Sequence, residues 1–117
     1  MTYIDAFVLP VPKDRTADYD RIAGESAALW AEYGAIAYFE CRADDAPAGT
    51  LTSFPRSVMA TDNETVYLSI LVYPSREVRD AAMQKMMSDP RMKTYMDQVP
   101  TDGNRMFFGG FTSVLEG

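Results

Sequence analysis

Residues 65–73 read Thr-Val-Tyr-Leu-Ser-Ile-Leu-Val-Tyr, and this stretch does most to decide the fold. It is rich in β-branched and aromatic residues, with an aliphatic side chain at every second position, which is typical of a strand. Pro74 and Ser75 follow at once, and Ser75 is a suitable N-cap for a helix that has Glu77 in its first turn. The stretch therefore predicts a strand that leads directly into a helix.

The same signals recur on both sides of this strand. Apolar residues at three- and four-residue spacing indicate helices, and proline, glycine and aspartate mark turns and loops. The expected elements are strands at 3–10, 35–41 and 105–115, a helix capped by Asp14 or Thr16 and closed by Gly34, a loop at 43–55, a short extended piece at 56–60, and a helix after Ser75 that breaks at Asp89-Pro90. This β-α-β-(β)-β-α-β order predicts an α+β, ferredoxin-like fold with the helices on one face of the sheet.

The length and composition fit one folded domain that spans residues 1–117. Of the 117 residues, 47% are hydrophobic and 24% are charged, which is close to the average for globular domains. The net charge is -6 and no cluster of Lys or Arg is present, so binding to nucleic acid or to an anionic membrane is not expected. No apolar run approaches the ~20 residues that span a bilayer, and the first ten residues do not resemble a signal peptide. We expect a cytoplasmic protein.

The chain has no histidine and one cysteine, Cys41. This excludes a histidine-ligated haem, a histidine-based zinc site and a nucleophile–histidine dyad. A single cysteine also rules out an internal disulfide and a cysteine-rich metal site. We expect no cofactor and no metal.

The two faces of the predicted sheet differ in character, because strand residues alternate between faces. One set is aliphatic, and we assign it to the helix-packed core: Ile4, Ala6, Val8, Val66, Leu68, Ile70 and Val72. The other set is aromatic with scattered polar groups: Tyr3, Asp5, Phe7, Leu9, Tyr67, Ser69, Leu71 and Tyr73. Since a face open to water would be plainly polar, we expect a second copy of the chain to cover the aromatic face in a homodimer. The alternative is a partly exposed aromatic face on a monomer.

Asp5 and Glu40 are the candidate catalytic carboxylates. A carboxylate among aromatic rings is desolvated, which raises its pKa and suits it to general acid–base work. The alternative is a structural ion pair with Arg56, Arg91 or Arg105 that fixes the dimer or a loop.

The candidate ligand-binding residues lie on the aromatic face and at two arginines. Tyrosines on this face provide an apolar wall with hydroxyl groups that orient a ligand, although a tyrosine-rich dimer interface would look the same. A guanidinium group can hold a substrate carboxylate, or can tie a loop or cap a helix instead. The candidates are Tyr3, Phe7, Tyr38, Arg56, Tyr67 and Arg91.

Several strings, in order along nearly the whole chain, resemble the YbaA-like family of bacterial proteins, domain of unknown function 1428, in the dimeric α/β-barrel superfamily. They are Tyr3-Ile4-Asp5-Ala6-Phe7, Glu40-Cys41, Thr52-Ser53-Phe54-Pro55-Arg56, Pro74-Ser75, Val78-Arg79-Asp80, Asp89-Pro90-Arg91-Met92 and Gly109-Gly110-Phe111. The resemblance implies a homodimer in which two ferredoxin-like sheets face each other. It implies no particular reaction, because the wider superfamily includes cofactor-free monooxygenases, haem-degrading enzymes, isomerases and sensors.

Three functional hypotheses follow. The first is a homodimer that binds a small organic molecule in a cleft lined by the aromatic face. The second is a cofactor-independent enzyme, a proton-transfer isomerase or a monooxygenase, that uses Asp5 and Glu40. The third is a non-catalytic interaction protein in which the aromatic face serves only assembly.

Overall fold

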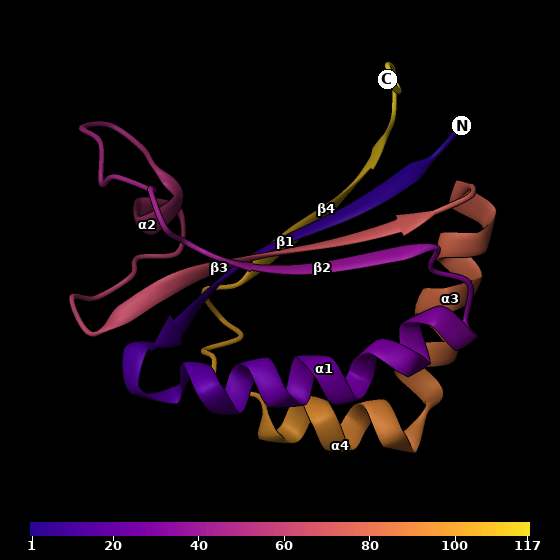
Figure 1. Cartoon of the computed structure of the whole chain (residues 1–117), viewed down its shortest axis with the longest axis horizontal. Helices are drawn as coiled ribbons and strands as arrows, with labels where there is room; N and C mark the ends of the chain where they lie inside the picture. Colours follow the sequence, from indigo (N-terminus) through magenta and orange to yellow (C-terminus); the bar gives the residue numbers. More distant parts are fainter.

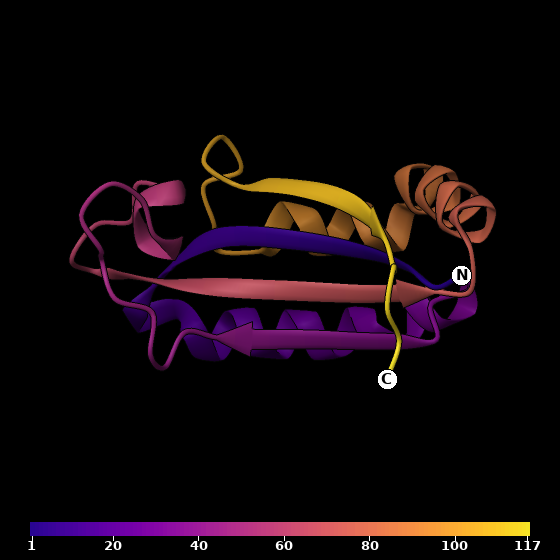
Figure 2. The same ribbon diagram turned by 90° about the horizontal axis from the view of Figure 1, so that it is seen from above.

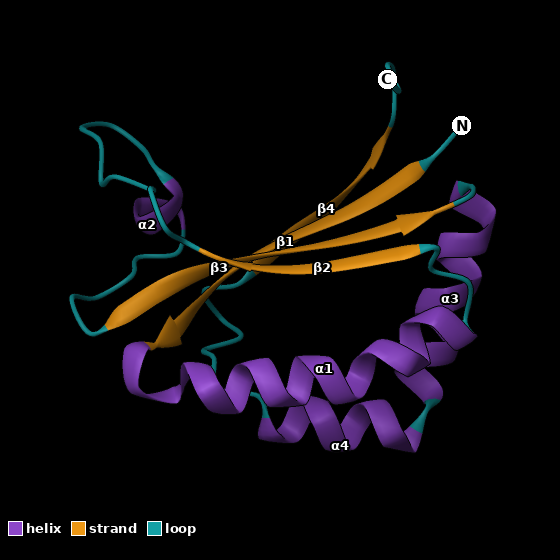
Figure 3. Cartoon of the chain, viewed as in Figure 1, coloured by secondary structure: helices purple, strands orange, loops and turns teal.

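The computed structural model describes all residues, Met1–Gly117, and confirms the α+β, ferredoxin-like fold. A single antiparallel sheet has the strand order β2-β3-β1-β4 (Figures 1 and 3). The strands are β1 (Tyr3–Pro12), β2 (Ala37–Arg42), β3 (Glu64–Tyr73) and β4 (Phe107–Thr112). The helices are a 3-10 turn (Lys13–Arg15), α1 (Thr16–Glu32), α2 (Phe54–Ser57), α3 (Arg76–Ser88) and α4 (Pro90–Gln98).

Local sequence explains where the helices start and stop. The Ser75 hydroxyl accepts a hydrogen bond from the Val78 amide, and the Asp89 carboxylate accepts one from the Arg91 amide, so both residues act as N-caps as predicted. Gly34 ends α1 with a φ of 115°, a conformation that favours glycine.

Two local predictions were wrong. The first helix has no side-chain cap, because the 3-10 turn at Lys13–Arg15 leads into it and Thr16 is its first residue. A short extended piece was expected at 56–60, but its first two residues belong to the short helix α2. Ser53 is the N-cap of α2, and its hydroxyl accepts a hydrogen bond from the Arg56 amide. A one-turn helix of this kind gives no periodic signal in a sequence.

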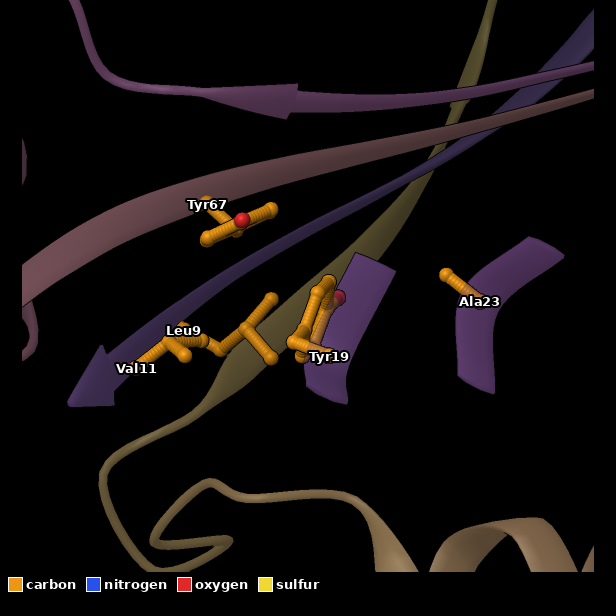
Figure 4. Packing of buried hydrophobic residues seen from close by; sticks show 5 residues of the cluster. All are labelled: Leu9, Val11, Tyr19, Ala23 and Tyr67. Atoms are coloured by element: carbon orange, nitrogen blue, oxygen red, sulfur yellow. The ribbon is translucent and has the colours of Figure 1, made fainter. Parts of the chain in front are cut away.

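Helices α1, α3 and α4 all lie on one side of the sheet. Figure 2 shows α1 beneath β2 and β3, and α4 beneath β1 and β4. The side chains that meet these helices are the aromatic set, so the predicted assignment of the two faces was wrong. Figure 4 shows Tyr67 and Leu9 of the sheet directed toward Tyr19 of α1, and the Tyr19 and Tyr67 ring centroids are 4.3 Å apart.

Hydrogen bonding supplies the physical reason for this arrangement. Buried tyrosine, serine and aspartate side chains need polar partners. The helices provide such partners for Tyr3, Tyr67 and Ser69, and Arg79 of α3 forms an ion pair with Asp5. The aliphatic set has no such requirement, and it forms the opposite face.

The opposite face of the sheet is apolar and carries no long helix (Figure 1). Val8 and Val66 are buried at one end of it, under Val58 after α2. Farther along, Phe39 is 55% exposed and Phe111 is 59% exposed. The remaining apolar residues of this side are not covered by α2 or Val58, and we refer to them as the open face. They include Ile4, Phe39, Ile70, Val72 and Phe111. None of the helices combines the length and the hydrophobicity that a membrane span requires.

Candidate functional site

A cavity of about 360 Å³ lies between the aromatic face of the sheet and the helices. Of the 21 residues that line it, 16 are hydrophobic, so its wall suits an apolar molecule. Phe7, Leu9 and Leu71 form part of the sheet side, and Trp30 contributes from α1. Six methionines complete much of the remaining wall: Met83, Met86, Met87, Met92, Met96 and Met106.

The helical side of the cavity reaches the protein surface near α3 and α4. Met87 of α3 is 85% exposed and Met96 of α4 is 55% exposed, although both line the cavity. Lys93 lies with them and pairs with Asp97 at 2.9 Å, so its ammonium group is directed to a surface carboxylate. We refer to Met87, Lys93 and Met96 as the mouth.

The carboxylate of Glu40 provides the main polar group of the cavity, and three hydroxyl groups donate to it. Tyr19 Oη donates to Glu40 Oε1 at 2.8 Å, and Ser69 Oγ donates to the same oxygen at 2.6 Å. Tyr38 Oη donates to Glu40 Oε2. We refer to Tyr19, Tyr38, Glu40 and Ser69 as the polar corner.

The two tyrosines of the polar corner remain neutral donors. Burial raises the pKa of Tyr19 well above its usual value, and the negative charge of Glu40 raises it further. Burial, followed by the charge of Glu40, likewise raises the pKa of Tyr38. Both tyrosines therefore stay protonated near neutral pH, and Glu40 is the acceptor of their hydrogen bonds.

A second hollow, of about 470 Å³, lies on the outer side of the polar corner between α1 and the edge strand β2. Its polar residues are linked to one another. Tyr67 Oη donates to Asp20 Oδ1 at 2.5 Å, and Arg42 Nη1 lies 3.5 Å from Tyr67 Oη. Burial, followed by the bond to Asp20, raises the pKa of Tyr67 to about 12.

A separate buried cluster surrounds Asp5. This side chain is fully buried, and its Oδ1 lies 3.3 Å from Arg79 Nε of α3. Arg79 Nη2 also donates to Tyr3 Oη at 2.9 Å, and the guanidinium lies over the Tyr3 ring. Burial raises the pKa of Asp5, whereas the charge of Arg79 lowers it. Neither oxygen of Asp5 has a hydrogen-bond partner, and nor does Tyr73 Oη.

The structure brings together only part of the predicted site. Phe7, Tyr38 and Glu40 line the cavity, and Tyr67 lines the adjoining hollow. Tyr3 and Asp5 lie in the Arg79 cluster and are not part of the cavity wall.

The two predicted arginines lie away from the cavity. Arg56 Nε donates to the Ala48 carbonyl at 2.7 Å, so it ties its own loop. Arg91 is exposed and binds the buried Asp89, which caps α4, and the exposed Glu32 of α1. None of the ion pairs suggested as alternatives for Asp5 and Glu40 is formed, because Asp5 pairs with Arg79 and Glu40 receives hydroxyl groups.

Sequence reasoning missed Tyr19, Ser69 and Arg79 as site residues. Ser69 shares its strand parity with Tyr67 and Leu71, so its place on the aromatic face was available from the sequence. Tyr19 lies at three- and four-residue spacing from Ile22 and Ala23, a pattern that indicates a core position on the helix and not a site residue. The link from Arg79 to Asp5 depends on how α3 packs across the sheet, which residue spacing does not reveal.

The fold and this site define a ferredoxin-like α+β protein with an apolar cavity between its sheet and helices. The chain belongs to the family described as "Protein of unknown function (DUF1428)", whose model matches residues 2–103. It is 49% identical over 116 residues to the Escherichia coli (strain K12) protein described as "Uncharacterized protein YbaA", and the match covers 99% of each chain.

Solved structures of low sequence identity share the fold. A dimeric ferredoxin-like protein from an uncultured marine organism matches with a TM-score of 0.67 and 9% identity, over 100% of both chains. SnoaB from Streptomyces nogalater, described as a cofactor-independent oxygenase, matches with a TM-score of 0.59 and 16% identity, over 98% of this chain and 93% of that one.

Proposed function

We propose that this protein binds a small, largely apolar molecule whose one polar group donates a hydrogen bond to Glu40, and that it does so as a homodimer. The observation that carries the proposal is the polar corner at the end of a cavity whose other walls are mostly hydrophobic. A cavity of about 360 Å³ falls within the ~300–1,000 Å³ of typical ligand sites.

Counting lone pairs identifies the polar group of the ligand. A carboxylate offers about four acceptor positions. Glu40 Oε1 receives Tyr19 and Ser69, and Oε2 receives only Tyr38. One acceptor position on Oε2 is therefore left for a phenol, an enol or an N–H group.

The methionines of the cavity wall suit a ligand whose apolar part is flat, or ligands whose apolar parts differ in shape. Methionine side chains are flexible and polarizable, and they make favourable contacts with aromatic rings. Trp30 and Phe7 offer aromatic surface in the same cavity. A hydroxylated aromatic molecule meets both requirements.

Fluorescence titration with 2-naphthol tests this proposal, with 2-methoxynaphthalene as the matched ligand that lacks the donor. We expect the wild-type protein to prefer 2-naphthol. Glu40→Gln should weaken 2-naphthol about tenfold, as for a lost hydrogen bond to a charged group. The same substitution should change the affinity for 2-methoxynaphthalene much less.

Glu25→Gln, on the exposed side of α1, is the matched control. Equal affinity for the two naphthalenes in both wild type and Glu40→Gln would disprove the role of Glu40. If neither compound binds the wild-type protein at millimolar concentration, ligand binding in this cavity is disproved.

The homodimer is supported by the open face. Monomeric proteins seldom leave more than a few hundred Å² of contiguous apolar surface uncovered. On β2, β3 and β4, Phe39, Ile70 and Phe111 belong to one such surface. A second copy of the same sheet is the simplest cover, and solved structures with this fold include proteins described as dimeric.

Catalysis is the second candidate function, and the same carboxylate favours it. A bound phenol or carbon acid would transfer a proton to Glu40, and the resulting anion could react with molecular oxygen without a cofactor. SnoaB, which has the same fold, is described as a cofactor-independent oxygenase. In the overall reaction one O₂ is consumed, one oxygen atom enters the product as a carbonyl and the other leaves as water.

Oxygen uptake separates catalysis from simple binding. With naphthalene-1,3-diol as the probe, a catalyst should consume one O₂ for each diol oxidised, faster than in buffer alone. Glu40→Gln should remove this acceleration. Uptake at the buffer rate, together with saturable binding of the diol, would leave binding as the function.

A further inference from the structure

Glu40 and Tyr38 line two spaces at once, the inner cavity and the outer hollow. The polar corner is therefore a thin partition between an apolar interior and a polar recess at the surface. The inner side is dominated by hydrophobic residues, whereas the outer side also carries Asp20, Arg42 and Tyr67. Water can bridge polar groups in such a recess, so the recess suits the passage of protons.

The hollow exists because α1 presents small residues to the edge strand at this point. Ala23, Gly24 and Ala27 follow Asp20 along one side of the helix and line the hollow. A Cβ placed on Gly24 would meet no atom within 4 Å. The space is therefore real, and larger side chains would fill it.

The opposite end of the cavity has a different character. At the mouth, Met87 and Met96 are largely exposed, and Lys93 is engaged by Asp97. An apolar molecule would cross this end without removing charged groups from water. At the hollow, the same molecule would have to displace Tyr38 and Glu40 from their mutual hydrogen bond.

We propose that the two openings have separate tasks: the mouth admits the ligand, and the hollow exchanges protons between Glu40 and solvent. This inference rests on the proposed binding function and adds a proton route to it. In the step itself, the ligand O–H bond breaks, its electron pair stays on the ligand oxygen, and the proton forms a bond to Glu40 Oε2. Glu40 then passes the proton to water in the hollow.

The excited state of 2-naphthol tests the route directly. On excitation this compound becomes a much stronger acid, and the naphtholate that forms emits at longer wavelength than the neutral naphthol. A proton that reaches Glu40 and leaves through the hollow yields naphtholate emission. A proton that cannot leave returns to the naphtholate and quenches this band.

Gly24→Leu fills the hollow, and Ala28→Leu is the matched control on the exposed side of the same helix. We expect Gly24→Leu to keep the Kd and the association rate of 2-naphthol within about twofold of wild type, as for a change outside the binding contacts. It should lose most of the naphtholate emission of the bound probe. Ala28→Leu should keep all three quantities.

Ala27→Leu provides a second way to fill the hollow if Gly24→Leu does not fold. Unchanged naphtholate emission in a folded, hollow-filled variant would overturn the proton route. Slower association of 2-naphthol would show that the hollow, and not the mouth, admits the ligand, which would also overturn the inference. Absence of 2-naphthol binding to the wild-type protein would instead overturn the proposed function.

Discussion

At the scale of single residues, Asp5 and Arg79 form an ion pair between a fully buried carboxylate and a largely buried guanidinium group. Two charges are removed from water, and the carboxylate accepts no further hydrogen bond. Removing one partner of a buried ion pair leaves the other charge buried and uncompensated. Replacing both partners with apolar side chains is often tolerated. The pair therefore links β1 to α3 in a way that single substitutions and double substitutions should distinguish.

Arg79→Met is expected to lower the free energy of unfolding by ~3–5 kcal/mol, because Asp5 then lies buried without a countercharge. The double variant Asp5→Leu/Arg79→Met should recover most of this loss. Urea denaturation measures both values. Arg76→Met, at an exposed position of the same helix, is the control and should change stability by about 0.5 kcal/mol or less. A double variant no more stable than Arg79→Met would contradict this account.

The lowered pKa of Glu64 predicts how the stability of the fold depends on pH. Two hydrogen bonds from Arg105, at 2.8 and 2.7 Å, are the main cause that lowers the pKa of Glu64 from 4.5 to about 2. Because the folded-state pKa is lower than the unfolded one, Glu64 stabilises the fold above about pH 4.5, and this contribution is lost as the pH falls toward 2.

Glu64→Gln should therefore lower the free energy of unfolding by ~2–3 kcal/mol at pH 7, and by roughly half as much at pH 3. Urea denaturation of both proteins at the two pH values gives the comparison. A difference that stays constant, or that grows in acid, would mean that the ion pair does not stabilise the folded state.

At the scale of elements, β4 and α3 approach each other closely at one glycine. A Cβ on Gly110 would collide with Arg79 Nη2 and Tyr3 Oη, whereas a Cβ on Gly109 would meet nothing nearer than the Phe111 ring at 3.5 Å. The two adjacent glycines lie on opposite faces of β4, so they form a natural matched pair.

Gly110→Ala should lower the free energy of unfolding by ~1–3 kcal/mol, as expected for overpacking. Gly109→Ala should be nearly neutral. Thermal unfolding of the two variants under the same conditions would show the contrast. Equal melting temperatures would indicate that Arg79 and Tyr3 move aside at little cost.

The four strands and the long helices were predictable from sequence, but which face of the sheet meets the helices was not. Strand 65–73 and the capping residues Ser75 and Asp89 carry local signals that tertiary packing does not change. Both faces of β3 are largely apolar, so hydrophobicity alone could not decide which one meets the helices. The polar atoms of Tyr67 and Ser69 decided it, because Asp20 and Glu40 lie within their reach.

The same limit applied to the candidate site. Glu40 was predicted as a carboxylate among aromatic rings and Tyr38 as a tyrosine of the ligand-binding wall, and both line the cavity. Six methionines from separate parts of the chain line the cavity. A cavity forms where side chains from distant parts of the sequence do not fill the space between them. The spacing of residues along the chain therefore does not predict it.

At the scale of the whole molecule, the open face is the feature that the single chain leaves incomplete. Aspartate at Phe39 or Ile70 would place a charge in the centre of the proposed dimer interface, where it has no partner. Each of these substitutions should convert a dimer to a folded monomer, measured by sedimentation at micromolar concentration. Ala28→Asp, on the far side of α1, should leave the assembly unchanged. A wild-type protein that sediments as a monomer would contradict the proposed interface.

The methionine wall has a further consequence for the life of the protein under oxidising stress. Conversion of a thioether to a sulfoxide turns a flexible apolar group into a polar one. Met87 and Met96 stand at the mouth, where peroxide reaches them first, while Met86 and Met92 lie buried behind. Oxidation would therefore begin at the mouth and make it hydrophilic while the interior of the cavity stayed intact. The uptake of apolar molecules would decline well before the protein unfolded.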